Sequence, residues 1–359
     1  MHKSKKIISI MMVGLFLMAM AVGCGVGQVS ARTKNILTSS SGGNSYWQQF
    51  YQNVSTKVIN RNPAPAPTPV TPTPVTPTPP VTPVTPVNPV TPVTPVTPTT
   101  TGKLWGAYLS DGNVSAFQTS VGKTMDMQAS FNGWGDSFPS SSDKTKTQII
   151  FWEPTNVSLS SITSGGSDSY MSQFVGQAKA YGGPVILIPF EEMNGNWDTW
   201  DGGYGSNTPA QVVAAFKHIH DVIASVGATN VKLGWDVNND SVPDTSANSI
   251  ANYWPGAAYV DYVCVDGFNF GSPWQTYSDV FSSVLSQVKG YNKPILITST
   301  ASSAGSQKSA WITDALNQIY SDPSVTGFIW FNENKEQNWL VNSDSAALQA
   351  FKTAIQQYQ

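Results

Sequence analysis

Apolar residues recur along the C-terminal part of the chain in eight short runs, and segments with helical spacing follow most of them. A short apolar run bounded by polar residues is typical of a buried strand, whereas apolar residues three and four apart indicate a helix with one buried face. The expected strands are Leu104–Leu109, Met125–Phe131, Gln148–Trp152, Pro184–Phe190, Val231–Trp235, Val260–Val265, Pro294–Thr298 and Gly327–Phe331. The clearest expected helices are Tyr170–Tyr181, Pro209–Val226, Val280–Val288, Lys308–Tyr320 and Ala346–Tyr358.

This alternation predicts the fold of the C-terminal part. Strands that alternate with helices form parallel sheets with right-handed crossover connections. Eight such repeats over about 260 residues fit a closed (β/α)8 barrel, the TIM barrel. The competing fold is a doubly wound open sheet. That fold normally carries a Gly-rich phosphate-binding turn after an early strand, and this sequence has no such turn.

The first 24 residues have the pattern of an export signal. Three lysines among the first six residues precede an apolar run over residues 7–22, and small residues follow it. The run is short and flanked by charge on one side only, which favours a cleaved secretory signal over a transmembrane anchor. The residues before Cys24 also resemble a bacterial lipobox, with Ala21 where Leu is usual. We therefore expect an extracellular protein, held at the cell surface as a lipoprotein through a lipid on Cys24.

Two further segments separate this signal from the expected barrel. Residues 25–62 are polar, and we assign them no function. Residues 63–100 are almost wholly Pro, Thr and Val, a composition that cannot bury a core and adopts extended polyproline II, reaching on the order of 100 Å at about 3.1 Å per residue. The expected organisation is a signal peptide over 1–24, a polar segment over 25–62, a Pro/Thr/Val-rich linker over 63–100 and a barrel over 101–359.

The composition limits the ligands that the chain can take. A net charge of −3 and a charged fraction of 11% give no strong field for nucleic acid or an anionic membrane. His218 and His220 lie two apart on an expected helix, so they point to different sides and form no metal pair. Cys264 lies in an apolar run and is expected to be a buried thiol. We expect a monomer without metal or cofactor that meets a membrane only through Cys24.

In a barrel of this kind the functional residues gather where the strands end. Five of the expected strands run into carboxylates, amides and aromatic rings, namely Trp152-Glu153, Glu191-Glu192-Met193-Asn194, Trp235-Asp236, Asp266-Gly267-Phe268-Asn269 and Trp330-Phe331-Asn332-Glu333. This mixture suits a sugar, because acids act on the glycosidic oxygen, amides bind hydroxyls and flat rings cover the apolar sugar face. Taken singly, each residue has a plainer interpretation as a helix cap or a core side chain.

The segment Ile186–Trp197, which reads Ile-Leu-Ile-Pro-Phe-Glu-Glu-Met-Asn-Gly-Asn-Trp, resembles the signature of glycoside hydrolase family 26. Four other segments resemble the same family in the same order: Trp152–Pro154, Val265–Asn269, Lys293–Ile297 and Phe328–Lys335. Members of this family are retaining, endo-acting enzymes best known as β-mannanases, and some cut mixed-linkage β-glucan or β-xylan. The resemblance runs from about Leu104 to the C-terminus and implies a hydrolase that cleaves internal β-linkages of plant polysaccharide.

The resemblance places Glu192 at the acid/base position. A glycosidase acid must stay protonated near neutral pH, which indole walls and a neighbouring carboxylate such as Glu191 favour. Successive residues of a strand face opposite sides, so only one of the two glutamates is expected to face the ligand, and we take Glu192. Substrate contacts are expected from Trp152, Asn194, Trp197, Asp266, Phe268 and Trp330, of which Trp197 and Trp330 match aromatic positions of the family.

The sequence departs from the family at the nucleophile. The resemblance implies a nucleophilic Glu at the end of the seventh strand, and Ser299 stands at that position. No Asp or Glu occurs between Asp279 and Asp314, so a shifted alignment cannot supply one. Retaining hydrolysis needs two carboxyl groups about 5 to 5.5 Å apart. A serine without an adjacent base is a poor substitute, which argues against ordinary retaining hydrolysis.

Two functions therefore remain open. An inverting hydrolase needs only a base about 6.5 to 9.5 Å from the acid, and Asp266, Asp236 or Glu153 could serve. The alternative is a catalytically impaired barrel that binds polysaccharide at the cell surface, which Ser299 favours. Three lesser departures accompany Ser299, with Arg, His and Tyr of the family replaced by Ile188, Glu191 and Phe268. The acid and the aromatic residues lead us to predict an extracellular hydrolase of the β-mannanase type, acting on β-mannan or mixed-linkage β-glucan.

Overall fold

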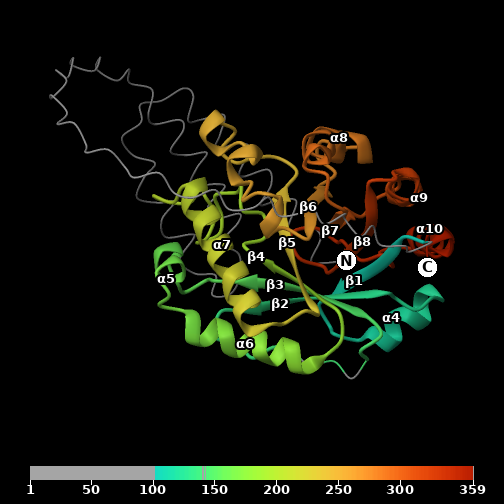
Figure 1. Ribbon diagram of the computed structural model, residues 1–359. Helices are drawn as coiled ribbons and strands as arrows, with labels where there is room; N and C mark the ends of the chain where they lie inside the picture. The colour runs from blue at the N-terminus through green and yellow to red at the C-terminus, as the bar shows by residue number, and fades with distance from the viewer. Residues whose placement is uncertain (1–101, 140, 142, 359) are drawn as a thin grey trace, which may run out of the picture. The chain divides into compact units, whose positions relative to one another are not determined.

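A computed structural model describes residues 102–139, 141 and 143–358 of the protein (Figure 1). The expected signal peptide with Cys24, the polar segment and the Pro/Thr/Val-rich linker lie outside these residues. Within the part of the chain that is described, no helix combines the length and the apolar character needed to cross a membrane.

The described residues form a closed barrel of eight parallel strands that follow one another in chain order. The strands are β1 Leu104–Leu109, β2 Met127–Gly133, β3 Thr147–Glu153, β4 Val185–Pro189, β5 Val231–Asn238, β6 Tyr262–Asn269, β7 Ile295–Ser302 and β8 Val325–Asn332. Each strand pairs with its neighbours, and β8 closes the barrel by pairing with β1 over six residue positions. The predicted (β/α)8 barrel is confirmed, and the open sheet is excluded because the barrel leaves no edge.

Helices cover the outside of the strands (Figure 1). They are α4 Val114–Val121, α5 Leu159–Thr163, α6 Asp168–Tyr181, α7 Pro209–Val226, α8 Tyr277–Val288, α9 Lys308–Ser321 and α10 Ser345–Ala354. Helix α7 begins where its sequence predicts, because Thr208 and Gln211 form a reciprocal capping box around Pro209. Short 3-10 turns replace a helix between β5 and β6: η1 Ser246–Asn248, η2 Ile250–Tyr253 and η3 Ala257–Tyr259. Two others, η4 Lys289–Tyr291 and η5 Ile355–Gln357, follow α8 and α10.

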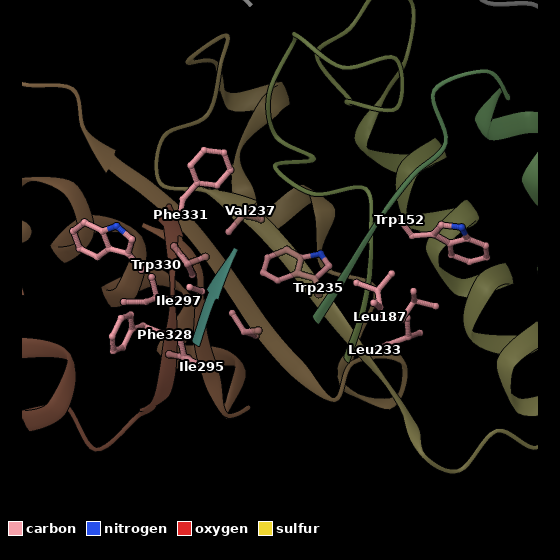
Figure 2. Packing of buried hydrophobic residues seen from close by; sticks show 14 of the residues in the cluster. Trp152, Leu187, Leu233, Trp235, Val237, Ile295, Ile297, Phe328, Trp330 and Phe331 are labelled. Atoms are coloured by element: carbon pink, nitrogen blue, oxygen red, sulfur yellow. The ribbon is translucent and has the colours of Figure 1, made fainter. Parts of the chain in front are cut away.

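Two separate apolar clusters pack against the two faces of the barrel sheet, one inside the barrel and one outside it. The inner cluster consists of Met127, Ala129, Ile149, Phe151, Ile186, Ile188, Cys264, Leu296 and Ile329. The larger outer cluster packs between the strands and the helices and includes Trp152, Trp235 and Trp330 (Figure 2). Successive strand residues alternate between the two clusters. The position of Cys264 in the inner cluster confirms that it is a buried thiol.

Strand β7 carries an irregularity that affects the site. Val265 of β6 pairs with Ile297, but the next residue, Asp266, pairs with Ser299, so Thr298 is one extra residue in β7. A bulge of this kind sets two residues of one strand opposite one residue of its partner. The Thr298 hydroxyl therefore reaches Asp236 and Asp266, while Ser299 lies level with Asp266.

Candidate active site

Glu192 lies in a turn directly after β4 whose backbone is strained. Phe190 and Glu192 have left-handed φ angles of 62° and 50°, a conformation that costs of order 1–3 kcal/mol for a residue with a side chain. Hydrogen bonds hold the turn in place: the Glu192 backbone N–H donates to Asp236 Oδ1 at 3.1 Å, and Trp200 Nε1 donates to the Glu191 carbonyl at 3.0 Å. Strain that the surroundings enforce in this way is typical of functional sites.

Two donors hold the Glu192 carboxyl group. Asn238 Nδ2 donates to Oε1 at 2.7 Å and Trp197 Nε1 donates to Oε2 at 3.0 Å. Burial and the nearby Asp236 carboxyl raise the pKa of Glu192 to about 7, although both hydrogen bonds favour the ionised form. The side chain remains partly exposed. A partly exposed carboxyl that is half protonated near neutral pH has the properties of a general acid.

Glu153 and Glu191 form a second pair of carboxyl groups beside this acid. Burial raises the pKa of both groups: that of Glu191 rises well above its ordinary value, with Glu153 as the second cause, and that of Glu153 rises less because its contact with Glu191 opposes the effect of burial. Glu191 Oε2 is buried and has no hydrogen-bond donor among the described residues. Two touching carboxyls share a proton, and the larger rise in the pKa of Glu191 places that proton on Glu191. Glu153, which is partly exposed, is the ionised partner.

Two further carboxyl groups lie at the inner face of the barrel. Asp236 of β5 is fully buried and Asp266 of β6 is 3% exposed. Thr298 Oγ1 lies 2.7 Å from an oxygen of each. Ser299 is 3% exposed and brings no charge to this group.

Two tryptophans that the sequence assigns to substrate contact lie elsewhere. Trp152 and Trp330 are fully buried in the outer cluster, well apart from each other (Figure 2). The Trp152 ring is stacked between Trp134 and Phe174, with centroid distances of 4.4 and 4.6 Å. The Trp330 indole packs against Phe351 and donates to the Trp339 carbonyl. Both rings lie on the side of the sheet that faces the helices, as do Ile150 and Phe328 two positions earlier on the same strands, so neither ring has surface for a sugar.

Asn194 and Asp266 are also inside the protein. Asn194 is fully buried, and its amide bonds the backbone of Asn238 in both directions, so it fixes the loop after β5 rather than a ligand. Asp266 is engaged by Thr298. Phe268 and Trp197 are partly exposed, and of the six expected contacts only these two keep surface for a substrate.

Several residues that were not expected to contact the substrate complete the site. Asn238 binds the acid, and Lys335, in the loop after β8, lowers the pKa of Glu192 and Glu153. Trp134 is partly exposed and covers Trp152 at the end of β2. An aromatic group at the strand ends is centred on Phe331, whose ring centroid lies 4.9 to 6.2 Å from those of Tyr108, Phe131 and Phe268. Their position directly at the end of an apolar run was the available signal, but a core aromatic gives the same pattern.

No group of His, Cys, Asp and Glu within the described ranges has an arrangement that could hold a metal ion. The acidic groups instead pair with hydroxyl, amide and indole donors or share protons. The chemistry available at this end of the barrel is therefore proton transfer by carboxyl groups beside aromatic surfaces.

Comparison with known proteins places the chain in a family. The sequence profile of glycosyl hydrolase family 26 matches residues 139–356, which is more than half of the chain. Endoglucanase H of Acetivibrio thermocellus is 36% identical over 267 residues, covering 70% of this chain and 29% of that protein. Mannan endo-1,4-beta-mannosidase of Bacillus subtilis is 26% identical over 170 residues, covering 46% of this chain and 43% of that protein. The chain thus spans less than half the length of either relative.

Solved structures with the same fold include the catalytic domain of an endo-beta-1,4-mannanase from a Bacillus species, with a TM-score of 0.56 and 15% identity over 71% of this chain and 86% of that one. A beta-mannanase from Bacteroides ovatus has a TM-score of 0.53 and 17% identity over 71% of this chain and 88% of that one. At these identities the likeness supports the fold alone.

Proposed function

The chain belongs to glycosyl hydrolase family 26, and we propose that it hydrolyses internal β-linkages of a plant polysaccharide with Glu192 as the general acid. The observation that carries this proposal is the environment of Glu192. Its carboxyl is held by Trp197 and Asn238, is partly exposed, and has a pKa raised to about 7 by burial and Asp236. An acid with these properties can protonate the leaving oxygen of a glycosidic bond near neutral pH.

We propose a β-1,4-containing glucan, such as mixed-linkage β-glucan, as the first substrate to test and β-mannan as the second. The relative named an endoglucanase is 36% identical to this chain, compared with 26% for the relative named a mannosidase. Partly exposed Trp134, Trp197 and Phe268 offer aromatic surface for the apolar faces of such sugars.

The second catalytic group in this proposal is Glu153. Ser299 occupies the position that the family resemblance assigns to a nucleophile, so the proposed reaction is inverting and needs a base for water. Of the three carboxyls that the sequence leaves as a base, Asp236 and Asp266 are buried against Thr298, whereas Glu153 is partly exposed. The contact with Glu191 lowers the pKa of Glu153 and so opposes the effect of burial, which favours its ionised form as a base.

Three matched variants test this assignment on soluble mixed-linkage β-glucan, with reducing ends as the readout. Glu192→Gln and Glu153→Gln should each lower kcat/KM by about 10²- to 10⁴-fold, the usual contribution of a general acid or base. Glu333→Gln is the control, because Glu333 is another partly exposed carboxyl beyond the end of β8. If kcat/KM falls in Glu333→Gln and stays unchanged in Glu153→Gln, the base lies at the end of β8 and its assignment to Glu153 is wrong.

The second candidate function is binding without hydrolysis, and Ser299 is the observation that favours it. A barrel without the second carboxyl would still offer its aromatic surface to a polysaccharide. Calorimetry with β-glucan and β-mannan oligosaccharides separates the two functions. Binding without any product after long incubation would support the binder.

We also propose that the protein is exported and anchored at the cell surface by a lipid on Cys24. The basic start, the apolar run over residues 7–22 and the small residues before Cys24 support this location. Mass spectrometry of the protein from its producing cell tests it. A mature chain that begins at Cys24 with a covalent lipid is expected, and an unmodified Cys24 would contradict it.

A further inference from the structure

We propose that Asp266, Thr298 and Asp236 form a directional hydrogen-bond chain that ends at the Glu192 backbone and keeps this acid protonated. The inference rests on the proposed function of Glu192 and adds three positioning residues to it. None of the three needs to touch the substrate, since they act on the acid through the barrel interior.

The geometry requires a shared proton. Thr298 Oγ1 lies 2.7 Å from Asp236 Oδ2 and 2.7 Å from Asp266 Oδ1, and all three side chains are buried. A hydroxyl carries a single proton, so it can donate to only one of the two carboxyls. The other contact is a hydrogen bond only if that carboxyl is protonated and donates to the hydroxyl oxygen. One aspartic acid and one aspartate therefore flank Thr298.

The contacts of Asp236 give the chain its direction. Asp236 Oδ2 faces Thr298, and Oδ1 accepts the Glu192 backbone N–H at 3.1 Å, so both oxygens of Asp236 accept hydrogen bonds. Acceptance by both oxygens is the pattern of an ionised carboxyl. Asp266 also accepts a hydrogen bond from the Ser299 backbone N–H, but its pKa is raised further than that of Asp236, so Asp266 is the protonated member and donates to Thr298 Oγ1, and Thr298 donates to Asp236. Burial, followed by Asp236, raises the pKa of Asp266 well above its ordinary value, in agreement with this order.

The chain acts on Glu192 in two ways. The Asp236 oxygen fixes the left-handed turn that presents Glu192, and the negative charge of Asp236 disfavours a second charge on the Glu192 carboxyl. The bulge in β7 makes this possible, because the extra residue is Thr298 itself. The bulge in β7 thus places Thr298 where it can act on Glu192 through Asp236.

Other charged and titratable groups act on the same carboxyls and must remain unchanged in any test. They are Glu191, Asp198 and Asp201 from the segment after β4, Cys264 on β6 and Lys335 after β8. Lys335 lowers the pKa of Glu192, in opposition to Asp236. Substitutions of Asp266, Thr298 or Asp236 alone leave all five groups in place.

The composition makes a direct measurement practical. The whole chain contains five glutamates, Glu153, Glu191, Glu192, Glu333 and Glu336. Protein labelled with ¹³C at the glutamate carboxyl carbon gives few signals, and Glu192→Gln identifies the Glu192 signal by its loss. The titration of that signal with pH reports the acid directly and requires no turnover. It therefore remains informative even if no polysaccharide is hydrolysed.

Asp236→Asn and Asp266→Asn are the matched pair. Asp236→Asn removes the charge that faces Glu192, so the Glu192 titration should move to lower pH by roughly one pH unit or more. Asp266→Asn keeps a donor for Thr298 in place of the acid proton, so the Glu192 titration should stay where it is in the wild type. If hydrolysis is detected, the basic limb of its pH profile should move to lower pH in Asp236→Asn and stay unchanged in Asp266→Asn.

Thr298→Val and Thr298→Ser test the role of the Thr298 hydroxyl between Asp266 and Asp236. Valine removes the donor that keeps Asp236 ionised, so Asp236 takes up a proton and the Glu192 titration should move to lower pH, whereas serine should preserve the wild-type titration. Melting curves confirm that each variant is folded. If the Glu192 titration stays at its wild-type pH in both Asp236→Asn and Thr298→Val, the proposed hydrogen-bond chain does not act on Glu192 and the proposal is wrong. A larger shift in Asp266→Asn than in Asp236→Asn, or equal shifts in both, would overturn its direction.

Discussion

Trp197→Phe isolates one of the two hydrogen bonds that hold the proposed acid. Phenylalanine keeps an aromatic ring but lacks the indole N–H, which donates to Glu192 Oε2 at 3.0 Å. A hydrogen bond to a charged group contributes about 1.5–3 kcal/mol and one to a neutral group about 0.5–1.5 kcal/mol. The bond therefore favours ionised over neutral Glu192 by about 1–1.5 kcal/mol, which corresponds to roughly one pH unit.

The sign of the effect follows from this difference. Loss of a bond that favours the ionised form raises the pKa of Glu192 above its wild-type value of about 7. The acid then stays protonated to higher pH, so the basic limb of kcat/KM should move up by roughly one pH unit. The assay is the pH dependence of reducing-end release from mixed-linkage β-glucan, alongside the ¹³C titration of Glu192.

Trp200→Phe is the matched control for this experiment. Trp200 lies in the same segment and is 2% exposed, but its Nε1 donates to the Glu191 carbonyl rather than to Glu192. This variant should lose stability and leave the basic limb in place. A limb that stays fixed in Trp197→Phe, or that moves to lower pH, would refute the argument that the indole stabilises ionised Glu192.

Three further predictions concern stability and packing. Burial raises the pKa of two carboxyls to about 7, those of Glu192 and Asp198, so the folded barrel binds more protons than the unfolded chain between about pH 4.5 and 7. Its melting temperature should therefore fall as pH rises through this window, and Asp198→Asn should flatten the curve. A Cβ at Gly195 would lie 2.6 Å from the Trp197 ring, so Gly195→Ala should reduce stability by about 1–3 kcal/mol in urea titrations and also lower activity; unchanged values would contradict the packing. A fragment that begins at Thr101 should fold alone and melt in one cooperative transition, and recovery of only unfolded material would contradict the boundary.

The strands were predictable because apolar runs mark them, but their polar ends were not. Strand β6 was expected to end at Val265 and continues to Asn269. Polar residues near the ends of β5 to β7 are buried only because neighbouring strands supply partners, as Thr298 does for Asp266. Such partners depend on the register between strands, which the sequence of one strand does not contain.

The aromatic contacts of the site show a related limit. Phe331 contacts the ring group at the strand ends, whereas its neighbour Trp330 packs behind the sheet. A shift of one residue in a strand exchanges the two faces, and both residues are aromatic, so the pattern alone could not decide between them. The choice of Glu192 over Glu191 rests on a resemblance that covers the whole segment and stays a prediction; in the structure Glu192 is partly exposed and Glu191 is buried.

The most direct test of the account is proton NMR of freshly formed products from mixed-linkage β-glucan, with wild-type protein and Glu192→Gln in parallel. We expect the wild type to release sugars with the inverted anomeric form, as for hydrolysis by an acid and a distant base, and Glu192→Gln to release none above background. Equal product from Glu192→Gln, or no product from the wild type after long incubation, would contradict the claim that this barrel is a hydrolase with Glu192 as its acid.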